Sequence, residues 1–173
     1  MDNTPNEKRI TGYDIAFLAA VISVLVFVLW RLPRGYARSD ESYYITMAWR
    51  FVRGDVMIIH ERNSAQFFAL LLYPFVKAYL AINGSTEGII LAGRYLYLSW
   101  MLIVCLCLYI RFRKSYPTAA IALSVMLLLY VPNQIMATSY YTLGLVCTFL
   151  LTLLFAFPCK NKKAGNFLIG LLY

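Results

Sequence analysis

The residues best suited to chemistry are two adjacent carboxylates, Asp40 and Glu41, in an arginine-rich stretch. A carboxylate can act as a general base toward a hydroxyl or amine, or it can bind a divalent cation. A structural interpretation is also open, because the helix dipole stabilises acidic side chains in a first turn. Ser39 is a good N-cap residue, so the same two carboxylates are expected to begin a helix.

Arg94 is the second unusual residue, since it lies about one turn inside an apolar block that begins at Ile89. An arginine at the centre of a membrane span costs about 2.5–3.5 kcal/mol, and less near an end, so a functional role is the first expectation. The guanidinium can pair with a lipid phosphate or with a carboxylate from a loop. Snorkelling of the side chain to the membrane interface is the bland alternative.

Tyrosines are frequent near the ends of the apolar blocks, where most are expected to form an interfacial belt. Aromatic faces also pack on sugar rings, and Tyr44, Tyr140 and Tyr141 are candidates to line a substrate. The single His60 has no histidine or cysteine at zinc-ligand spacing. The four cysteines are interpreted as packing residues.

The elements that must position these side chains are strongly apolar. Of 173 residues, 61% are hydrophobic and 14% are charged, and the mean hydropathy is +0.66. Soluble domains have roughly 45–50% apolar and about 25% charged residues. The composition therefore predicts an all-α membrane protein and excludes a disordered chain. The net charge is +8, and the charged residues lie between the apolar blocks. This distribution favours membrane lipids and phosphates as partners over nucleic acid.

The hydropathy pattern predicts a polytopic transmembrane helical bundle. A cytoplasmic N-terminus over 1–14 precedes a first span over 15–32, which is interpreted as an uncleaved anchor rather than a signal sequence. Residues 33–88 form an outer loop with juxtamembrane helices, and three further spans lie within 89–157. The apolar segment 164–173 is half the length of a span, so the chain is interpreted as a fragment.

The segment 67–82 decides the topology, because it is short and is interrupted by a proline and a lysine. If it spans, the basic loops share a side with the arginine-rich loop, and the orientation is inverted. If it stays on the outer surface, the basic clusters lie in the cytoplasm with the N-terminus, as the positive-inside rule requires. We favour the second topology, which places the two carboxylates, Arg94 and the 132–141 segment on one face of the membrane.

Several short motifs follow one another in a characteristic order. They are Ser39–Tyr44, Ala48–Phe51, Gly54–Asp55, Tyr73–Pro74, Gly84–Ser85 and Gly93–Leu96. This order resembles the N-terminal part of the GT-C type polytopic glycosyltransferases, the superfamily of protein O-mannosyltransferases and aminoarabinose transferases. The resemblance covers roughly residues 12–157 and depends on order and spacing, because each motif is short.

The resemblance implies transfer of a sugar from a polyprenyl-phosphate donor to a glycan, lipid or protein acceptor, with inversion, at the outer face of a bacterial plasma membrane. It implies that Asp40 is the base and that Glu41 positions the acceptor or helps to hold Mg²⁺ or Mn²⁺. Arg94 would contact the donor phosphate. The sequence differs from the well-known branches of this superfamily at residues 64–67, and it has no acidic residue over 132–141, where many members carry one. The resemblance therefore does not identify the sugar or the acceptor.

Two other classes of protein compete with this interpretation. A non-catalytic polytopic protein would bind or handle lipid-linked sugars through Arg94 and the basic loop. A transporter is disfavoured, because the sequence has no inverted repeat and no equivalent pair of Gly/Pro-broken helices. The sequence also has no glycine-rich phosphate loop and no serine-hydrolase elbow.

Overall fold

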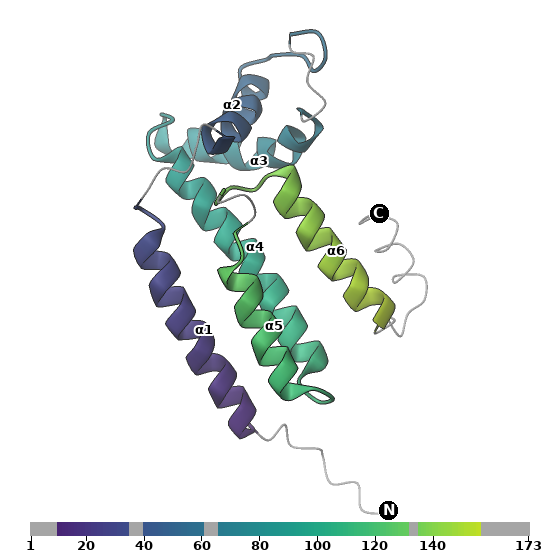
Figure 1. Cartoon of the computed structure of the whole chain (residues 1–173). Coiled ribbons are helices and arrows are strands. Elements are labelled where there is room, and N and C mark those ends of the chain that lie inside the picture. The colour runs from purple at the N-terminus through teal and green to yellow at the C-terminus, as the bar shows by residue number, and fades with distance from the viewer. Residues whose placement is uncertain (1–9, 35–39, 61–65, 132–134, 157–173) are drawn as a thin grey trace, which may run out of the picture.

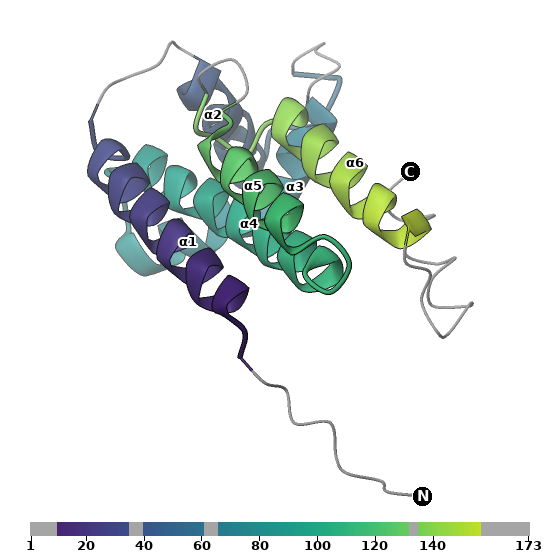
Figure 2. The ribbon, with the colours of Figure 1, turned by 60° about the horizontal axis from the view of Figure 1, so that its bottom comes forward.

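The computed structural model describes residues 10–34, 40–60, 66–131 and 135–156, where all regular secondary structure is helical. The helices are α1 (Gly12–Arg31), α2 (Asp40–Val52), α3 (Gln66–Asn83), α4 (Ile89–Phe112), α5 (Pro117–Leu129) and α6 (Tyr140–Ala156). The expected all-α class is confirmed for this part of the chain. Figures 1 and 2 show α1, α4, α5 and α6 running alongside one another, with α2 and α3 across one end.

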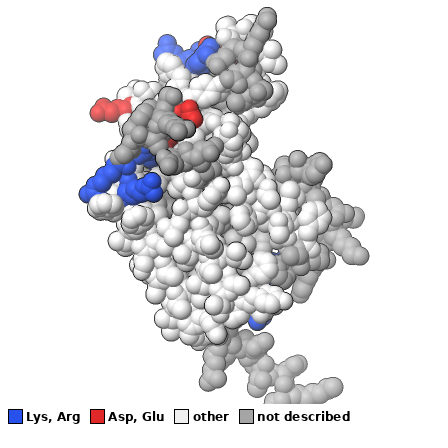
Figure 3. All heavy atoms as spheres, viewed as in Figure 1, with Lys and Arg blue, Asp and Glu red and all other residues white. Residues whose placement is uncertain are grey.

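The helices α1 and α4 are long and apolar enough to cross a membrane. They have 20 and 24 residues, and the mean hydropathy over an 18-residue stretch of each is 2.3 and 1.9. The outward side of α1 carries exposed apolar side chains such as Leu18, Ile22 and Val26. Figure 3 shows a broad uncharged surface along the bundle and charged side chains gathered near the α2–α3 end. The other apolar helices, α3, α5 and α6, are shorter.

The far end of the bundle is fixed by Asp14 in the first turn of α1. Thr11 caps this helix, and its backbone N–H donates to Asp14 Oδ2 at 2.8 Å. Asp14 Oδ1 accepts a hydrogen bond from the Tyr109 hydroxyl at 2.8 Å and pairs with Arg113 Nη1 at 2.6 Å. Because Tyr109 and Arg113 end α4, these contacts join the first turn of α1 to the last turn of α4.

The helices α2 and α3 form a separate layer across the opposite end. Phe68, Leu72 and Val76 of α3 share a buried cluster with Tyr44 and Met47 of α2. Pro74 lies within α3 without ending it. This transverse position of α3 is what the topology with 67–82 on the outer surface requires, and that topology stays a prediction. The residues before α2, at 35–39, and the segment 164–173 lie outside the described residues.

The layer rests on α4 through a close contact at Gly93. A β-carbon added at Gly93 would lie 2.9 Å from Ile45 Cδ1 of α2, closer than carbon atoms normally approach. Glycine at this position therefore lets the two helices cross with little space between their backbones. The crossing places the first turn of α2 over the first turns of α4.

We expect Gly93→Val to lower the free energy of unfolding by about 1–3 kcal/mol, because the added carbons overpack the α2–α4 contact. The matched control is Gly144→Val in α6, since nothing lies within 4 Å of a β-carbon built there. Thermal unfolding of both variants in the same detergent measures the difference. Equal stability of the two variants would contradict a close α2–α4 contact.

Candidate functional site

A buried ion pair between Glu41 and Arg94 lies where α2 crosses α4. The two residues are only 1% and 7% exposed. Arg94 Nε donates to Glu41 Oε2 at 2.9 Å, and Nη2 lies 2.7 Å from the same oxygen. Two backbone groups complete the arrangement: Arg94 Nη1 donates to the Leu32 carbonyl at 2.6 Å, and the Met136 N–H donates to Glu41 Oε1 at 3.0 Å.

This pair connects four segments that are far apart in the sequence. Leu32 follows α1, Glu41 begins α2, Arg94 lies in α4, and Met136 belongs to the buried stretch 135–139 before α6. Two charges removed from water are tolerated only when they are paired and their remaining polar atoms are hydrogen-bonded. The backbone contacts to Leu32 and Met136 meet that condition, so the pair holds the four segments in one arrangement.

The sequence left Arg94 open to a lipid phosphate, a loop carboxylate or the membrane interface. The structure pairs it with the carboxylate of Glu41 and buries it. Contact with a donor phosphate stays a prediction. Both oxygens of Glu41 also have hydrogen-bond donors, so a metal role for Glu41 stays a prediction as well. Among the residues that the structure describes, no three histidine, cysteine or acidic side chains form a metal-binding group.

Asp40 is half-buried in the first turn of α2, one helical turn before Tyr44, which is one of the tyrosines that the sequence named as substrate-lining candidates. Its negative charge acts on both Tyr44 and Tyr141. Burial raises the pKa of Tyr44 above its usual range, and Tyr140 and Asp40 add to the shift. The Tyr44 phenol therefore stays protonated at neutral pH and can donate a hydrogen bond next to the Asp40 carboxylate.

The tyrosines form a continuous aromatic wall beside Asp40. The ring of Tyr44 meets Tyr140 edge-on, with centroids 5.9 Å apart, and Tyr140 lies 4.0 Å from Tyr141. Phe68 of α3 supports Tyr44 from the other side, at 5.1 Å. Tyr140 and Tyr141 are 45% and 44% exposed, so the wall is accessible from outside. The fold thus brings residues 40–44 and 140–141 together at one end of the bundle.

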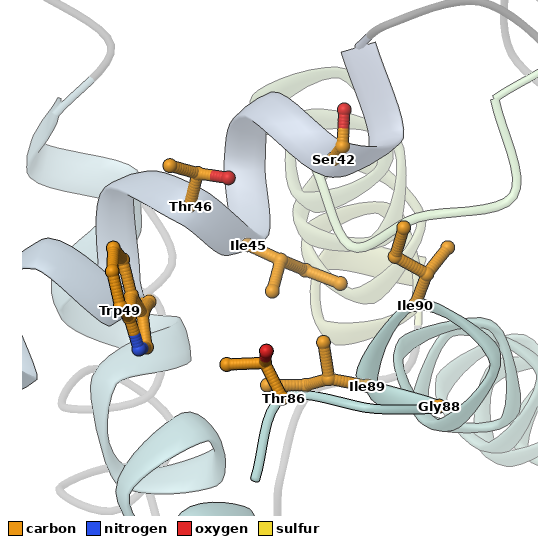
Figure 4. A pocket seen from close by; sticks show the side chains of 8 residues that line it. All are labelled: Ser42, Ile45, Thr46, Trp49, Thr86, Gly88, Ile89 and Ile90. Atoms are coloured by element: carbon orange, nitrogen blue, oxygen red, sulfur yellow. The ribbon is translucent and has the colours of Figure 1, made fainter.

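The other flank of α2 borders a pocket of about 340 Å³ (Figure 4). Its lining residues are Ser42, Ile45, Thr46, Trp49, Thr86, Gly88, Ile89 and Ile90. Sequence reasoning did not find this pocket. The spacing of residues 42, 46 and 49 places them on one face of a helix and was the available signal. The opposite wall comes from the turn that precedes α4 and from the first two residues of α4, and helical periodicity does not show that this segment faces α2.

A scan of protein-family models and searches of curated proteins and of solved structures found no match to this chain. The chemistry of the site is therefore argued from its own residues. A half-buried carboxylate beside protonated phenols and an accessible aromatic wall is suited to accept a proton from a hydroxyl compound. The neighbouring Glu41–Arg94 pair keeps the helix that carries this carboxylate in place.

We expect Arg94→Met to lower the free energy of unfolding by about 3–5 kcal/mol, because it leaves the Glu41 carboxylate buried without its partner. The double variant Glu41→Gln, Arg94→Met removes both charges and should recover most of that loss. Denaturant unfolding of the single and double variants measures the coupling. Additive losses would show that the two side chains do not interact.

Proposed function

We propose that the protein is a membrane glycosyltransferase of the GT-C type, which moves a sugar from a polyprenyl-phosphate donor to an acceptor at the outer membrane face. The observation that carries the proposal is the environment of Asp40. Its carboxylate lies at the end of the apolar bundle and beside an accessible wall of tyrosines, on a helix fixed by a buried ion pair. The order of motifs from 39 to 96 supports the same family.

In this proposal Asp40 acts as the general base. It takes the proton of the acceptor hydroxyl as the acceptor oxygen attacks the anomeric carbon of the donor sugar. The bond from that carbon to the phosphate oxygen breaks, and the lipid phosphate leaves with the electron pair. Attack from the face opposite the leaving phosphate inverts the configuration at the anomeric carbon.

Glu41 and Arg94 act on this reaction from beneath Asp40. Glu41 follows Asp40 directly. The ion pair of Glu41 with Arg94 therefore also fixes the position of Asp40 in the first turn of α2. Contact of Arg94 with the donor phosphate is retained as part of the proposal, and it requires the guanidinium to share its charge between the phosphate and Glu41. Tyr44, Tyr140 and Tyr141 offer aromatic faces to a sugar ring. Mg²⁺ or Mn²⁺ is retained as a proposed cofactor with Asp40 and Glu41 as its candidate ligands, and Glu41 would bind it only by leaving its pair with Arg94.

The proposed location is a multi-pass protein of a bacterial plasma membrane, with the α2–α3 layer outside. A lipid-linked donor presents its sugar-phosphate bond at the interface, where Asp40 would lie if α1 and α4 cross the bilayer. The opposite end holds Arg111 in the last turn of α4 and Arg113 and Lys114 directly after it. Basic residues at that end fit the cytoplasmic side of the membrane.

We expect Asp40→Asn to lower sugar transfer by about 10²–10⁴-fold, the range for loss of a general base, while donor binding is retained. Transfer is measured in membranes from cells that express the full-length protein, with the wild type and both variants at the same expression level. The control is Glu87→Gln, since Glu87 is an exposed acid in the turn before α4. The competing class, a non-catalytic protein that binds lipid-linked sugars, predicts equal behaviour of the two variants.

The orientation can be tested separately with single cysteines. In a chain whose own cysteines are replaced by alanine, Ser85→Cys should react with an impermeant thiol reagent added to intact spheroplasts. Ser115→Cys should react only after the membrane is opened, because it lies in the turn at the other end of α4. Both positions are exposed, so burial does not explain a difference. Protection of Ser85→Cys with labelling of Ser115→Cys would invert the proposed orientation.

A further inference from the structure

The helix α2 has a second functional face besides the one that carries Asp40. Ser42, Thr46 and Trp49 project from the flank opposite the tyrosine wall and form one side of the 340 Å³ pocket. Figure 4 shows the indole of Trp49 edge-on, so that its flat face forms a wall of the space in front of Ile45 and Thr86. Small-molecule sites typically have volumes of about 300–1,000 Å³, and this pocket lies within that range.

The hydroxyl of Thr46 lacks the bond to its own helix that several other hydroxyls of the described helices make. Hydroxyls of this kind usually turn back to the carbonyl four residues earlier in their own helix. The described residues that do so are Ser23, Ser99, Thr148 and Thr152. Thr46 makes no such bond within the described part of the chain and borders the pocket instead. Figure 4 shows the Thr86 hydroxyl on the facing wall, turned toward the same space.

We propose that this pocket binds a sugar ring of an extended acceptor, a glycan or glycolipid, at a distance from its reacting hydroxyl, because the pocket and Asp40 lie on opposite flanks of α2. The flat face of Trp49 packs against the C–H face of the ring, as in other contacts between aromatic and apolar surfaces. Thr46 and Thr86 exchange hydrogen bonds with the ring hydroxyls. Ile45, Ile89 and Ile90 exclude water from the remaining side. The acceptor role rests on the proposed transferase activity, whereas the binding of a sugar ring does not.

The residues that line the pocket favour a sugar over the other ligands present at a membrane surface. A lipid chain would leave the hydroxyls of Thr46 and Thr86 facing hydrocarbon, which costs free energy for each unpaired polar group. An anionic headgroup would need a cation; the lining side chains are all uncharged, and the nearby Arg53 guanidinium lies over the Trp49 ring, 5.2 Å from its centroid. A sugar ring has one apolar face and a rim of hydroxyls, which matches both parts of the pocket.

Trp49 provides a direct signal for binding. Replacement of Trp30 and Trp100 by phenylalanine leaves Trp49 as the only tryptophan, because the sequence has three. The full chain in nanodiscs of phosphatidylethanolamine and phosphatidylglycerol is titrated with methyl glycosides of mannose, glucose, galactose and xylose. We expect at least one glycoside to change the Trp49 emission saturably. Thr46→Val should weaken that binding about five- to tenfold, and the control Ser99→Ala should leave it unchanged.

Four outcomes would overturn the proposal. The first two are no saturable change with any glycoside and equal affinity in Thr46→Val. The third is strong quenching of Trp49 by phospholipids brominated on the acyl chain, with no protection by a glycoside, which would assign the pocket to a lipid chain. Inorganic phosphate in place of the glycosides tests an anion site, and a saturable response to phosphate alone would also overturn it.

The transfer assay distinguishes failure of this proposal from failure of the proposed function. Thr46→Val should raise the KM for the acceptor with little change in kcat, whereas Asp40→Asn should lower kcat. Glycoside binding without any transfer by the wild-type protein would support the sugar pocket and overturn the transferase. Transfer with an unchanged acceptor KM in Thr46→Val would overturn the pocket as the acceptor site.

Discussion

The arrangement of the described helices depends on one buried ion pair, between Glu41 and Arg94. Removal of two charges from water is costly, and the cost is offset only where every polar atom of the pair has a partner. Here those partners include the Leu32 carbonyl and the Met136 N–H, which belong to segments on either side of the crossing. A different position of α2 would leave a buried charge unpaired. The pair therefore selects one arrangement, while the surrounding apolar contacts supply most of the stability.

The close contact at Gly93 makes this pair geometrically feasible. Gly93 precedes Arg94, and Ile45 follows Glu41 by one turn, so the steric contact and the ion pair lie side by side on the same two helices. Once the crossing is set, the rotation of α2 about its axis is also set. Asp40 and Tyr44 then face the tyrosines of α6, and Thr46 and Trp49 face the turn before α4. One constraint thus produces two accessible surfaces on a single short helix.

Local patterns of the sequence predicted the helices better than the tertiary contacts between them. The start of a helix at Asp40 follows from the Ser39 N-cap signal and the first-turn acids, and it agrees with the start of α2. The importance of Arg94 follows from a charge in an apolar block, but its partner lies 53 residues away and depends on tertiary structure. For Tyr44 and Tyr140, the sequence predicted only that their segments lie on the same face of the membrane, and not that the two rings are in contact. The pocket was missed because half of its lining comes from the turn before α4 and the first residues of α4, and sequence periodicity does not show that this segment faces α2.

The adjacency of Asp40 and Glu41 explains how one dipeptide can carry two different roles. Successive residues of a helix point about 100° apart, so two neighbouring carboxylates cannot both face the same environment. The longer side chain of Glu41 extends inward to Arg94, and it is almost fully buried. The shorter Asp40 is half-buried at the start of α2, and its charge acts on Tyr44 and Tyr141. A site built in this way separates the carboxylate that fixes the helix from the carboxylate that is available for proton transfer.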